Sequence, residues 1–322
     1  MMAKRSLARA RRSRLQSPNS VSGALGTMLG IALARVAPRR FGYWLAARIA
    51  QFMAWRRNTL FCTIRTNLAH ILPVGTDPQE LDAAAERVIY YAGRGYYDVF
   101  RAGVDDYVSG RAPFRYDPME WELALNVLRS GRGTVLVGPH VGNFDLAAQW
   151  IRAQGIEMQA LSLSEPSTGN RMQNWLRRKR GIVVTPIGVS ALRLAVARLR
   201  NGGVVLTGVD RPVSLDDEPV SLFGAPARLP DGHVRLAMQA DVPVLVASCT
   251  LESDGCWMLH VAPPLEMERT GDREGDVRRN VRRVLAVVEG FIRMAPDQWL
   301  MFVPVWDESV HRCPPEHADS PC

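Results

Sequence analysis

His140 and Asp145 are the residues whose types and spacing suggest chemistry, within the segment TVLVGPHVGNFDLAAQW at positions 134–150. A carboxylate on one ring nitrogen of a histidine fixes the tautomer and stabilises the imidazolium. The other ring nitrogen can then take a proton from a hydroxyl. Such a pair would activate an alcohol or an amine without a protein nucleophile.

A turn between His140 and Asp145 is needed to bring them together, because residues five apart in a helix are about 140° out of phase. Gly142 supplies conformational freedom for the turn, and Asn143 is a good helix N-cap. We expect a strand ending near Gly138, then a turn and a helix, with the imidazole folded back onto the Asp145 carboxylate. In the alternative, Asp145 only stabilises the helix N-terminus, and the spacing alone favours that structural role.

Short apolar runs alternate with helical patterns from residue 120 onward. The runs that predict strands are 134–137, 158–163, 182–186, 204–209, 244–249 and 256–261. The patterns that predict helices are 120–129, 170–180, 190–200, 232–240 and 272–294. Strands separated by such helices need crossover connections. We therefore expect an α/β fold with a mixed, mainly parallel sheet covered by helices on both faces.

The predicted sheet places two polar segments at one edge. His140 follows the strand 134–137, and Asp210 follows the strand 204–209. Open α/β sheets place their sites at the carboxyl ends of strands, so both residues are expected near that edge. The stretch 210–231 is expected to be irregular, and 78–110 is expected to be helical.

Several common enzyme motifs are absent from the chain. It contains no GxSxG nucleophile elbow, HExxH motif, GxxxxGK[ST] loop or GxGxxG loop. Serine hydrolase, zinc peptidase, P-loop and dinucleotide-binding interpretations therefore lack a signal. The five cysteines show no CxxC spacing, so we expect no metal and no bound cofactor.

The net charge of +8 is concentrated near the N-terminus, because residues 1–76 contain no acidic residue. The basic residues there are interleaved with apolar and aromatic ones. This pattern suits an anionic membrane surface, where each nearby Lys or Arg adds roughly 1 kcal/mol. Nucleic acid is not expected as a partner, since the segment resembles no nucleic-acid-binding motif.

Four regions are predicted along the chain. They are a basic disordered arm at 1–20, a membrane-associated helical segment at 21–115, an α/β domain at 116–306 and a loose tail at 307–322. The apolar run 21–36 falls just short of the roughly 20 residues that span a bilayer, so a buried core helix and a membrane anchor both remain open. Residues 41–55 predict an amphipathic interfacial helix with Trp44 and Trp55 near its ends.

The motif PHVGNFD closely resembles the HxxxxD/E block of the bacterial lipid A late acyltransferase family, which includes lauroyl, myristoyl and phosphatidylinositol mannoside acyltransferases. Three further blocks resemble the family in the same order. They are RTNLAHIL, Asp210 and Arg211 followed by VSLFGAPARLPDGHVRLAMQADVPVLVAS, and APDQWLMFVPVW. Together the blocks cover residues 56–306, and four blocks in order are far more specific than one.

The resemblance implies an acyltransferase at the cytoplasmic face of the inner membrane, anchored or peripheral through its N-terminal segment. A fatty acyl group would pass from acyl carrier protein or acyl-CoA directly to a hydroxyl of a membrane glycolipid. His140 would be the general base and Asp145 its orienting partner. The chain is expected to act as a monomer, with the acyl thioester as a co-substrate.

Binding residues are expected around this pair. Arginines of the basic helix, and the arginine beside Asp210, could hold anionic groups of donor or acceptor, although each could equally be solvated surface charge. The full set of expected substrate-binding residues is Asn143, Arg171, Arg178, Arg180, Asp210 and Arg211.

Two departures from the lipid A members leave the acceptor open. Those members mostly carry Glu where Asp145 stands, and they usually keep basic residues where this chain has 302–306. Both features are closer to the phosphatidylinositol mannoside branch. Two other functions also remain: a non-catalytic lipid-binding protein on the same fold, and a thioester or lipid hydrolase in which His140 activates water.

Overall fold

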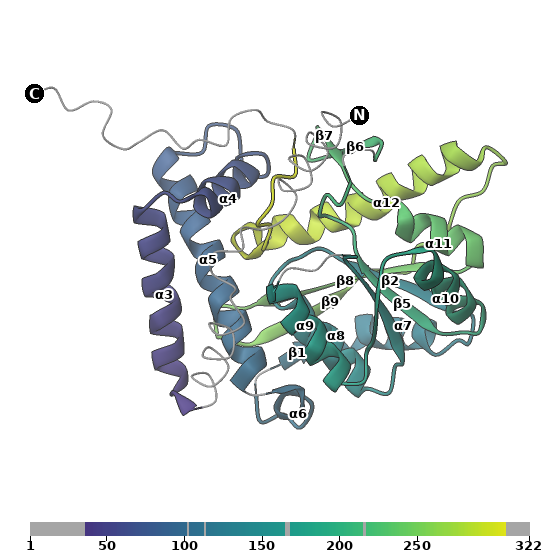
Figure 1. The fold of residues 1–322 in the computed structure, drawn as a ribbon, viewed down its shortest axis with the longest axis horizontal. Helices are drawn as coiled ribbons and strands as arrows, with labels where there is room; N and C mark the ends of the chain where they lie inside the picture. Colours follow the sequence, from purple (N-terminus) through teal and green to yellow (C-terminus); the bar gives the residue numbers. More distant parts are fainter. Residues whose placement is uncertain (1–35, 102, 113, 165–167, 215–216, 307–322) are drawn as a thin grey trace, which may run out of the picture.

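The computed structural model describes residues 36–101, 103–112, 114–164, 168–214 and 217–306. The arm predicted at 1–20 and the tail predicted at 307–322 lie outside the described residues. So does the apolar run 21–36, apart from Val36. Within the described part, Figure 1 shows a central sheet with helices on both faces and a group of helices at one end.

The central sheet has seven strands in the order β1-β9-β8-β2-β5-β3-β4. They are β1 (Phe114–Tyr116), β2 (Thr134–Gly138), β3 (Met158–Ser162), β4 (Val183–Pro186), β5 (Val204–Gly208), β8 (Val244–Leu251) and β9 (Trp257–Val261). Only β8 and β9 pair antiparallel; the other neighbours are parallel. The predicted mixed, mainly parallel sheet is confirmed.

Helices cover both faces of the sheet. They are α7 (Pro118–Leu128) and α8 (Phe144–Ala153), with α9 (Thr168–Lys179) beside α8, and on the other face α10 (Val189–Arg200), α11 (Gly232–Ala240) and α12 (Arg273–Met294). Strand β2 shows why both faces must be covered. Val135 and Val137 enter one hydrophobic cluster and Leu136 enters the other, as alternation along a strand requires.

One expectation, that 210–231 is irregular, needs correction. The stretch 210–231 contains a small hairpin of β6 (Pro219–Leu222) and β7 (Ala225–Arg228). Its two turn residues, Phe223 and Gly224, both have positive φ, which suits the twist of a two-residue hairpin turn. The helical expectation for 78–110 is confirmed by α5 (Pro78–Arg101) and the short α6 (Gly103–Val108).

The N-terminal helices pack at one end of the sheet, where α3 (Arg39–Trp55) lies along α5 and α4 (Thr59–Ala69) lies across it (Figure 1). Gly42 of α3 faces the ring of Tyr97, which leaves no room for a side chain. Tyr43 of α3 donates to the buried Asp98 of α5 at 2.6 Å, and Trp257 of β9 donates to the same carboxylate at 3.1 Å. Helix α3 is therefore tied into the folded domain.

None of the helices in the described part of the chain is both long and apolar enough to cross a bilayer. The amphipathic helix predicted at 41–55 is present as α3.

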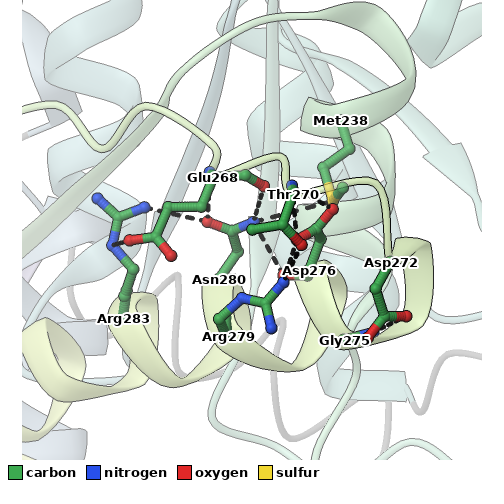
Figure 2. A network of polar contacts seen from close by, with 9 residues as sticks. All are labelled: Met238, Glu268, Thr270, Asp272, Gly275, Asp276, Arg279, Asn280 and Arg283. Atoms are coloured by element: carbon green, nitrogen blue, oxygen red, sulfur yellow. Dashed lines mark hydrogen bonds and ion pairs between the residues drawn. The ribbon is translucent and has the colours of Figure 1, made fainter.

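A polar network fixes the amino end of α12 to the segment that leaves β9 (Figure 2). Asn280 accepts from the backbone amide of Glu268 at 2.9 Å and donates to its carbonyl at 3.0 Å. The buried Asp276 accepts from the backbone amide and the hydroxyl of Thr270. Because Glu268 and Thr270 are both held, the amino end of α12 is fixed beside this segment, and the helix leads to the 3-10 turn η1 (Pro296–Gln298).

Candidate active site

His140 and Asp210 meet at the carboxyl ends of β2 and β5. These strands pair in parallel with Gly138 opposite Gly208, and each of the two polar residues lies two positions beyond its glycine. His140 Nδ1 lies 2.6 Å from Asp210 Oδ1, and the His140 backbone amide donates to Oδ2 at 2.8 Å. The expectation that both residues lie at one sheet edge is confirmed.

Asp210, and not Asp145, therefore bonds the imidazole. Asp145 lies in the first turn of α8, and its carboxylate accepts from Arg177 Nε of α9 at 2.6 Å. The expected turn is present, with Gly142 at φ 55° and Asn143 as N-cap. The turn directs the Asp145 side chain toward α9. The predicted contact between Asp145 and His140 is therefore wrong, and Asp145 bonds Arg177 instead.

The loop that carries His140 is held from two sides. The amide of Asn143 donates to the Cys249 carbonyl of β8 at 3.0 Å. On the other side, the amide of Gly142 donates to the Gln298 carbonyl at 2.8 Å, and the amide of Leu300 donates to the His140 carbonyl at 2.7 Å. The backbone that carries His140 is therefore hydrogen-bonded both to β8 and to the segment after α12.

Asp210 is fully buried and accepts a third hydrogen bond, from Trp299 Nε1 to Oδ2 at 2.7 Å. Burial raises the pKa of this carboxyl, but the charge of His140 and the hydrogen bonds from His140 and Trp299 outweigh it and hold the pKa below its ordinary value. An ionised Asp210 requires a proton on His140 Nδ1. When the imidazole is neutral, its lone pair is therefore on Nε2, which can meet a substrate hydroxyl.

The imidazole is also held by its packing. The edge of the ring meets Phe144, with centroids 5.0 Å apart and an interplanar angle of 74°. On another side lies Gly208, where an added Cβ would stand 2.9 Å from His140 Cε1. The His140 side chain is still 24% exposed, so the ring is ordered by neighbours yet reachable by a substrate.

A narrow cleft, partly open to solvent, adjoins the His140 loop and is called the pocket below. Its walls are mainly apolar and come from α5, α8, α9 and the segment after η1. The lining residues are Ala92, Gly95, Tyr96, Val99, Phe100, Gly142, Asn143, Phe144, Asp145, Gln149, Gln173, Leu176 and Leu300. Gln173 of α9 donates to the Tyr96 hydroxyl of α5 at 3.0 Å and so links two of these walls.

Asn143, predicted to bind substrate, uses its side chain within the protein. Its Oδ1 accepts from the Leu146 amide at 3.1 Å, and its Nδ2 donates to the Gly95 carbonyl of α5 at 3.2 Å. Asn143 therefore caps α8 and ties the loop to the pocket wall.

The predicted arginines fall in different places. Arg211 adjoins Asp210 and is largely enclosed; burial lowers its pKa, against the opposing charge of Asp210. Arg171 and Arg178 are exposed on α9, and Arg180 pairs with Asp105 at 2.8 Å at the surface. The structure thus brings only Arg211 next to the His140 and Asp210 pair.

Two residues of the site were not singled out from the sequence. Arg177 belongs to the basic helix, but its spacing does not distinguish it from the neighbouring arginines. Trp299 lies in the block APDQWLMFVPVW, which the family resemblance had marked without giving that tryptophan a role. Cys249 adjoins the loop, but burial raises the pKa of its thiol, which makes it a poor nucleophile.

Two phosphatidylinositol mannoside acyltransferases are similar to this chain over most of its length. A phosphatidylinositol mannoside acyltransferase from Mycolicibacterium smegmatis (strain ATCC 700084 / mc(2)155) is 26% identical over 288 residues, covering 88% of this chain and 90% of that protein. One from Mycobacterium tuberculosis (strain CDC 1551 / Oshkosh) is 28% identical over 255 residues, covering 76% of each.

The family match covers nearly the whole chain. Residues 12–308 match the family described as bacterial lipid A biosynthesis acyltransferase. This span includes α3 to α12 and the segment that ends at Trp306. The chain therefore belongs to the bacterial lipid A biosynthesis acyltransferase family, and it is an acyltransferase.

Proposed function

We propose that this enzyme transfers a fatty acyl group from an acyl thioester to a hydroxyl of a membrane glycolipid, of the lipid A precursor or phosphatidylinositol mannoside type. The main support is the His140 and Asp210 pair, whose imidazole packs against Phe144, a residue that lines an apolar pocket. The names of the similar mycobacterial proteins support a glycolipid acceptor.

His140 acts as the general base in this reaction. Its Nε2 takes the proton of the acceptor hydroxyl while the oxygen attacks the thioester carbonyl carbon. The C–O bond forms, the tetrahedral intermediate collapses and the C–S bond breaks. The departing sulfur takes the proton back from the imidazolium, so the histidine is regenerated. The buried Asp210 carboxylate stabilises the imidazolium between these two proton transfers.

The pocket beside the His140 loop holds the acyl chain. Phe144, Val99 and Leu176 present apolar surface to it, and Gly142 and Asn143 of the loop form another part of its wall. Phe144 also contacts the His140 ring, so a chain bound there would lie on the same side of the loop as the base. Asp145 and Arg177 contribute by joining α8 to α9, the two helices that form adjoining walls.

The anionic part of the donor lies along α9, a helix with no acidic residue. Arg171 and Arg178 are exposed there, and Lys179 lies 4.1 Å from the ring centroid of Trp175. This charge suits the phosphates of acyl-CoA and the acidic surface of an acyl carrier protein equally well. A competition assay with free CoA and with unacylated carrier protein would tell the two donors apart.

Helix α3 holds the enzyme on the anionic cytoplasmic face of the inner membrane. Its outward side carries Phe41, Trp44, Phe52 and Trp55, of which Trp44 and Trp55 are 52% and 70% exposed. Arg48 lies over Trp44 at 5.9 Å from the ring centroid. Aromatic rings combined with arginines on one side are typical of an interfacial helix that lies in the membrane plane.

The direct test is a product assay. The full-length enzyme is incubated with labelled palmitoyl-CoA or palmitoyl carrier protein, and with phosphatidylinositol mannoside or a lipid A precursor in mixed micelles. We expect labelled acylated glycolipid. Free fatty acid without acylated lipid would mean that His140 activates water and that the enzyme is a hydrolase. No turnover of any donor would contradict the proposal.

A further inference from the structure

Trp299 reaches the site from the far end of the sequence. It follows η1, is almost completely buried and donates from Nε1 to Asp210 Oδ2 at 2.7 Å. The same oxygen accepts from the backbone amide of His140, while Oδ1 faces His140 Nδ1. The two carboxylate oxygens therefore have different partners, and the indole contacts the oxygen that does not meet the ring.

The backbone around Trp299 is fixed to the same loop that carries the base. Trp299 forms an antiparallel bridge with Val141. One residue earlier, the Gln298 side chain accepts from the Leu251 amide at 2.8 Å and donates to its carbonyl at 2.9 Å. The indole donor is thus held relative to both β8 and the His140 loop before any substrate binds.

We propose that Trp299 is a positioning residue of the acyltransferase site, whose indole N–H fixes the Asp210 carboxylate so that Oδ1 points at His140. The proposal rests on the proposed function, because it assigns Trp299 a role through the general base. A buried carboxylate has no water to complete its hydrogen bonds, so each protein donor controls its rotation and its charge.

Removing this donor has two physical consequences. The carboxylate can rotate about its broad terminal torsion, which loosens the imidazole. The carboxylate also has one hydrogen-bond donor fewer to stabilise its negative charge. It therefore stabilises the imidazolium more strongly, which raises the pKa of His140. The pH at which activity begins should therefore rise, and kcat should fall.

The chain offers a matched control in Trp306. This second buried indole lies 6.2 Å from Trp299 between ring centroids and stacks on His70. Its nitrogen has no hydrogen-bond partner among the residues that the structure describes. Trp299→Phe and Trp306→Phe therefore remove the same group from neighbouring positions, and only the first of them takes a donor from Asp210.

The experiment compares kcat, KM and the pH profile of the two variants with those of the full-length enzyme. We expect Trp299→Phe to lower kcat about tenfold or more, to leave KM nearly unchanged and to move the acid limb of the profile upward by roughly half a pH unit or more. Trp306→Phe should keep the wild-type profile. Equal effects in both variants, or an unmoved acid limb in Trp299→Phe, would overturn the proposal.

A second measurement does not need activity or a folded variant. In the wild-type enzyme with ¹⁵N-labelled tryptophan, the sequentially assigned Nε1–H signal of Trp299 should shift as the His140 and Asp210 pair titrates, whereas that of Trp306 should not. A Trp299 signal that is constant with pH would contradict the inference.

The proposed function and this inference can fail separately. If His140→Ala kept normal turnover, His140 would not be the general base, and Trp299 could not act through it. If His140→Ala lost activity while Trp299→Phe kept wild-type activity, only the role of Trp299 would be contradicted, and the proposed function would stand.

Discussion

His140 is joined to Asp210 twice, through Nδ1 at 2.6 Å and through its backbone amide at 2.8 Å. A ring and a backbone that bond the same carboxylate cannot move independently, so the imidazole has a fixed direction. Because the pair follows from the register of β2 and β5, the base is positioned by the sheet itself.

Asp210→Asn should be far more damaging than Asp145→Asn. The first variant removes the charge that stabilises the imidazolium and favours the wrong tautomer, so kcat should fall on the order of 10³- to 10⁴-fold. The second weakens the bond to Arg177 and should cost roughly tenfold, with KM affected as well. Steady-state kinetics with a saturating thioester checks both. Equal losses in kcat would mean that Asp145 shares the role of Asp210.

Gly208→Ala should disturb the base without unfolding the protein. The new Cβ would stand 2.9 Å from His140 Cε1, so the ring has to move. A small displacement of a catalytic group can cost up to about 100-fold in rate, and we expect a loss of roughly ten- to 100-fold in kcat. Gly188→Ala is the matched control, because a Cβ there meets no atom within 4 Å. Wild-type kcat in Gly208→Ala would refute the packing argument.

His233 makes the enzyme sensitive to mild acid. It is buried on α11, and burial lowers its pKa to about 4. Between its ordinary value of about 6.5 and this lowered value, the unfolded chain binds a proton that the folded chain does not, so stability falls as the pH falls. By pH 5 the loss should approach about 2 kcal/mol.

Urea unfolding of the wild type and of His233→Leu at pH 7 and pH 5 measures this loss. The variant should lack the part of the acid sensitivity that His233 causes. Parallel loss of stability in both proteins would show that other groups are responsible.

Exposed aromatic residues of α3 should control membrane binding. Phe52→Ser combined with Trp55→Ser removes two side chains that are 60% and 70% exposed, so the fold should be unaffected. Burying one such side chain is worth roughly 1.5–3 kcal/mol, so binding should weaken at least about tenfold. Sedimentation with phosphatidylcholine vesicles containing phosphatidylglycerol measures it. Trp175→Ser, an exposed aromatic on α9, should bind like the wild type, and unchanged binding of the α3 variant would count against an interfacial helix.

Asn67 should be important for stability because it joins two distant parts of the chain. Its Nδ2 donates to the carbonyls of Met301 and Val303 at 3.1 and 2.9 Å, and its Oδ1 accepts from the Val305 amide at 3.2 Å. Asn67→Ala leaves these buried backbone groups without a partner, which should cost about 2–4 kcal/mol. Urea unfolding of Asn67→Ala and of the wild type measures this loss in the free energy of unfolding. Gln51→Ala, which changes an exposed residue, is the control. A loss below about 1 kcal/mol would show that water replaces the amide.

Much of the fold could be predicted because its signals are local. The apolar run 134–137 and its counterparts mark strands through continuous burial, and the helical patterns between them require crossovers. The turn after β2 could also be predicted, since Gly142 takes positive φ and Asn143 caps α8. The hairpin 219–228 was missed because its strands contain Pro219 and Pro226, which weaken a strand pattern.

The partners of His140 depended on the tertiary structure. The sequence marked His140 and placed Asp210 at the same sheet edge, but the nearest carboxylate along the chain was Asp145, only five residues away. Asp210 lies 70 residues from His140 and reaches it because β2 and β5 pair in one register, and Trp299 reaches it because α12 crosses the sheet. Hydrophobic periodicity determines which segments form strands, but register and helix direction come from packing among segments far apart in sequence.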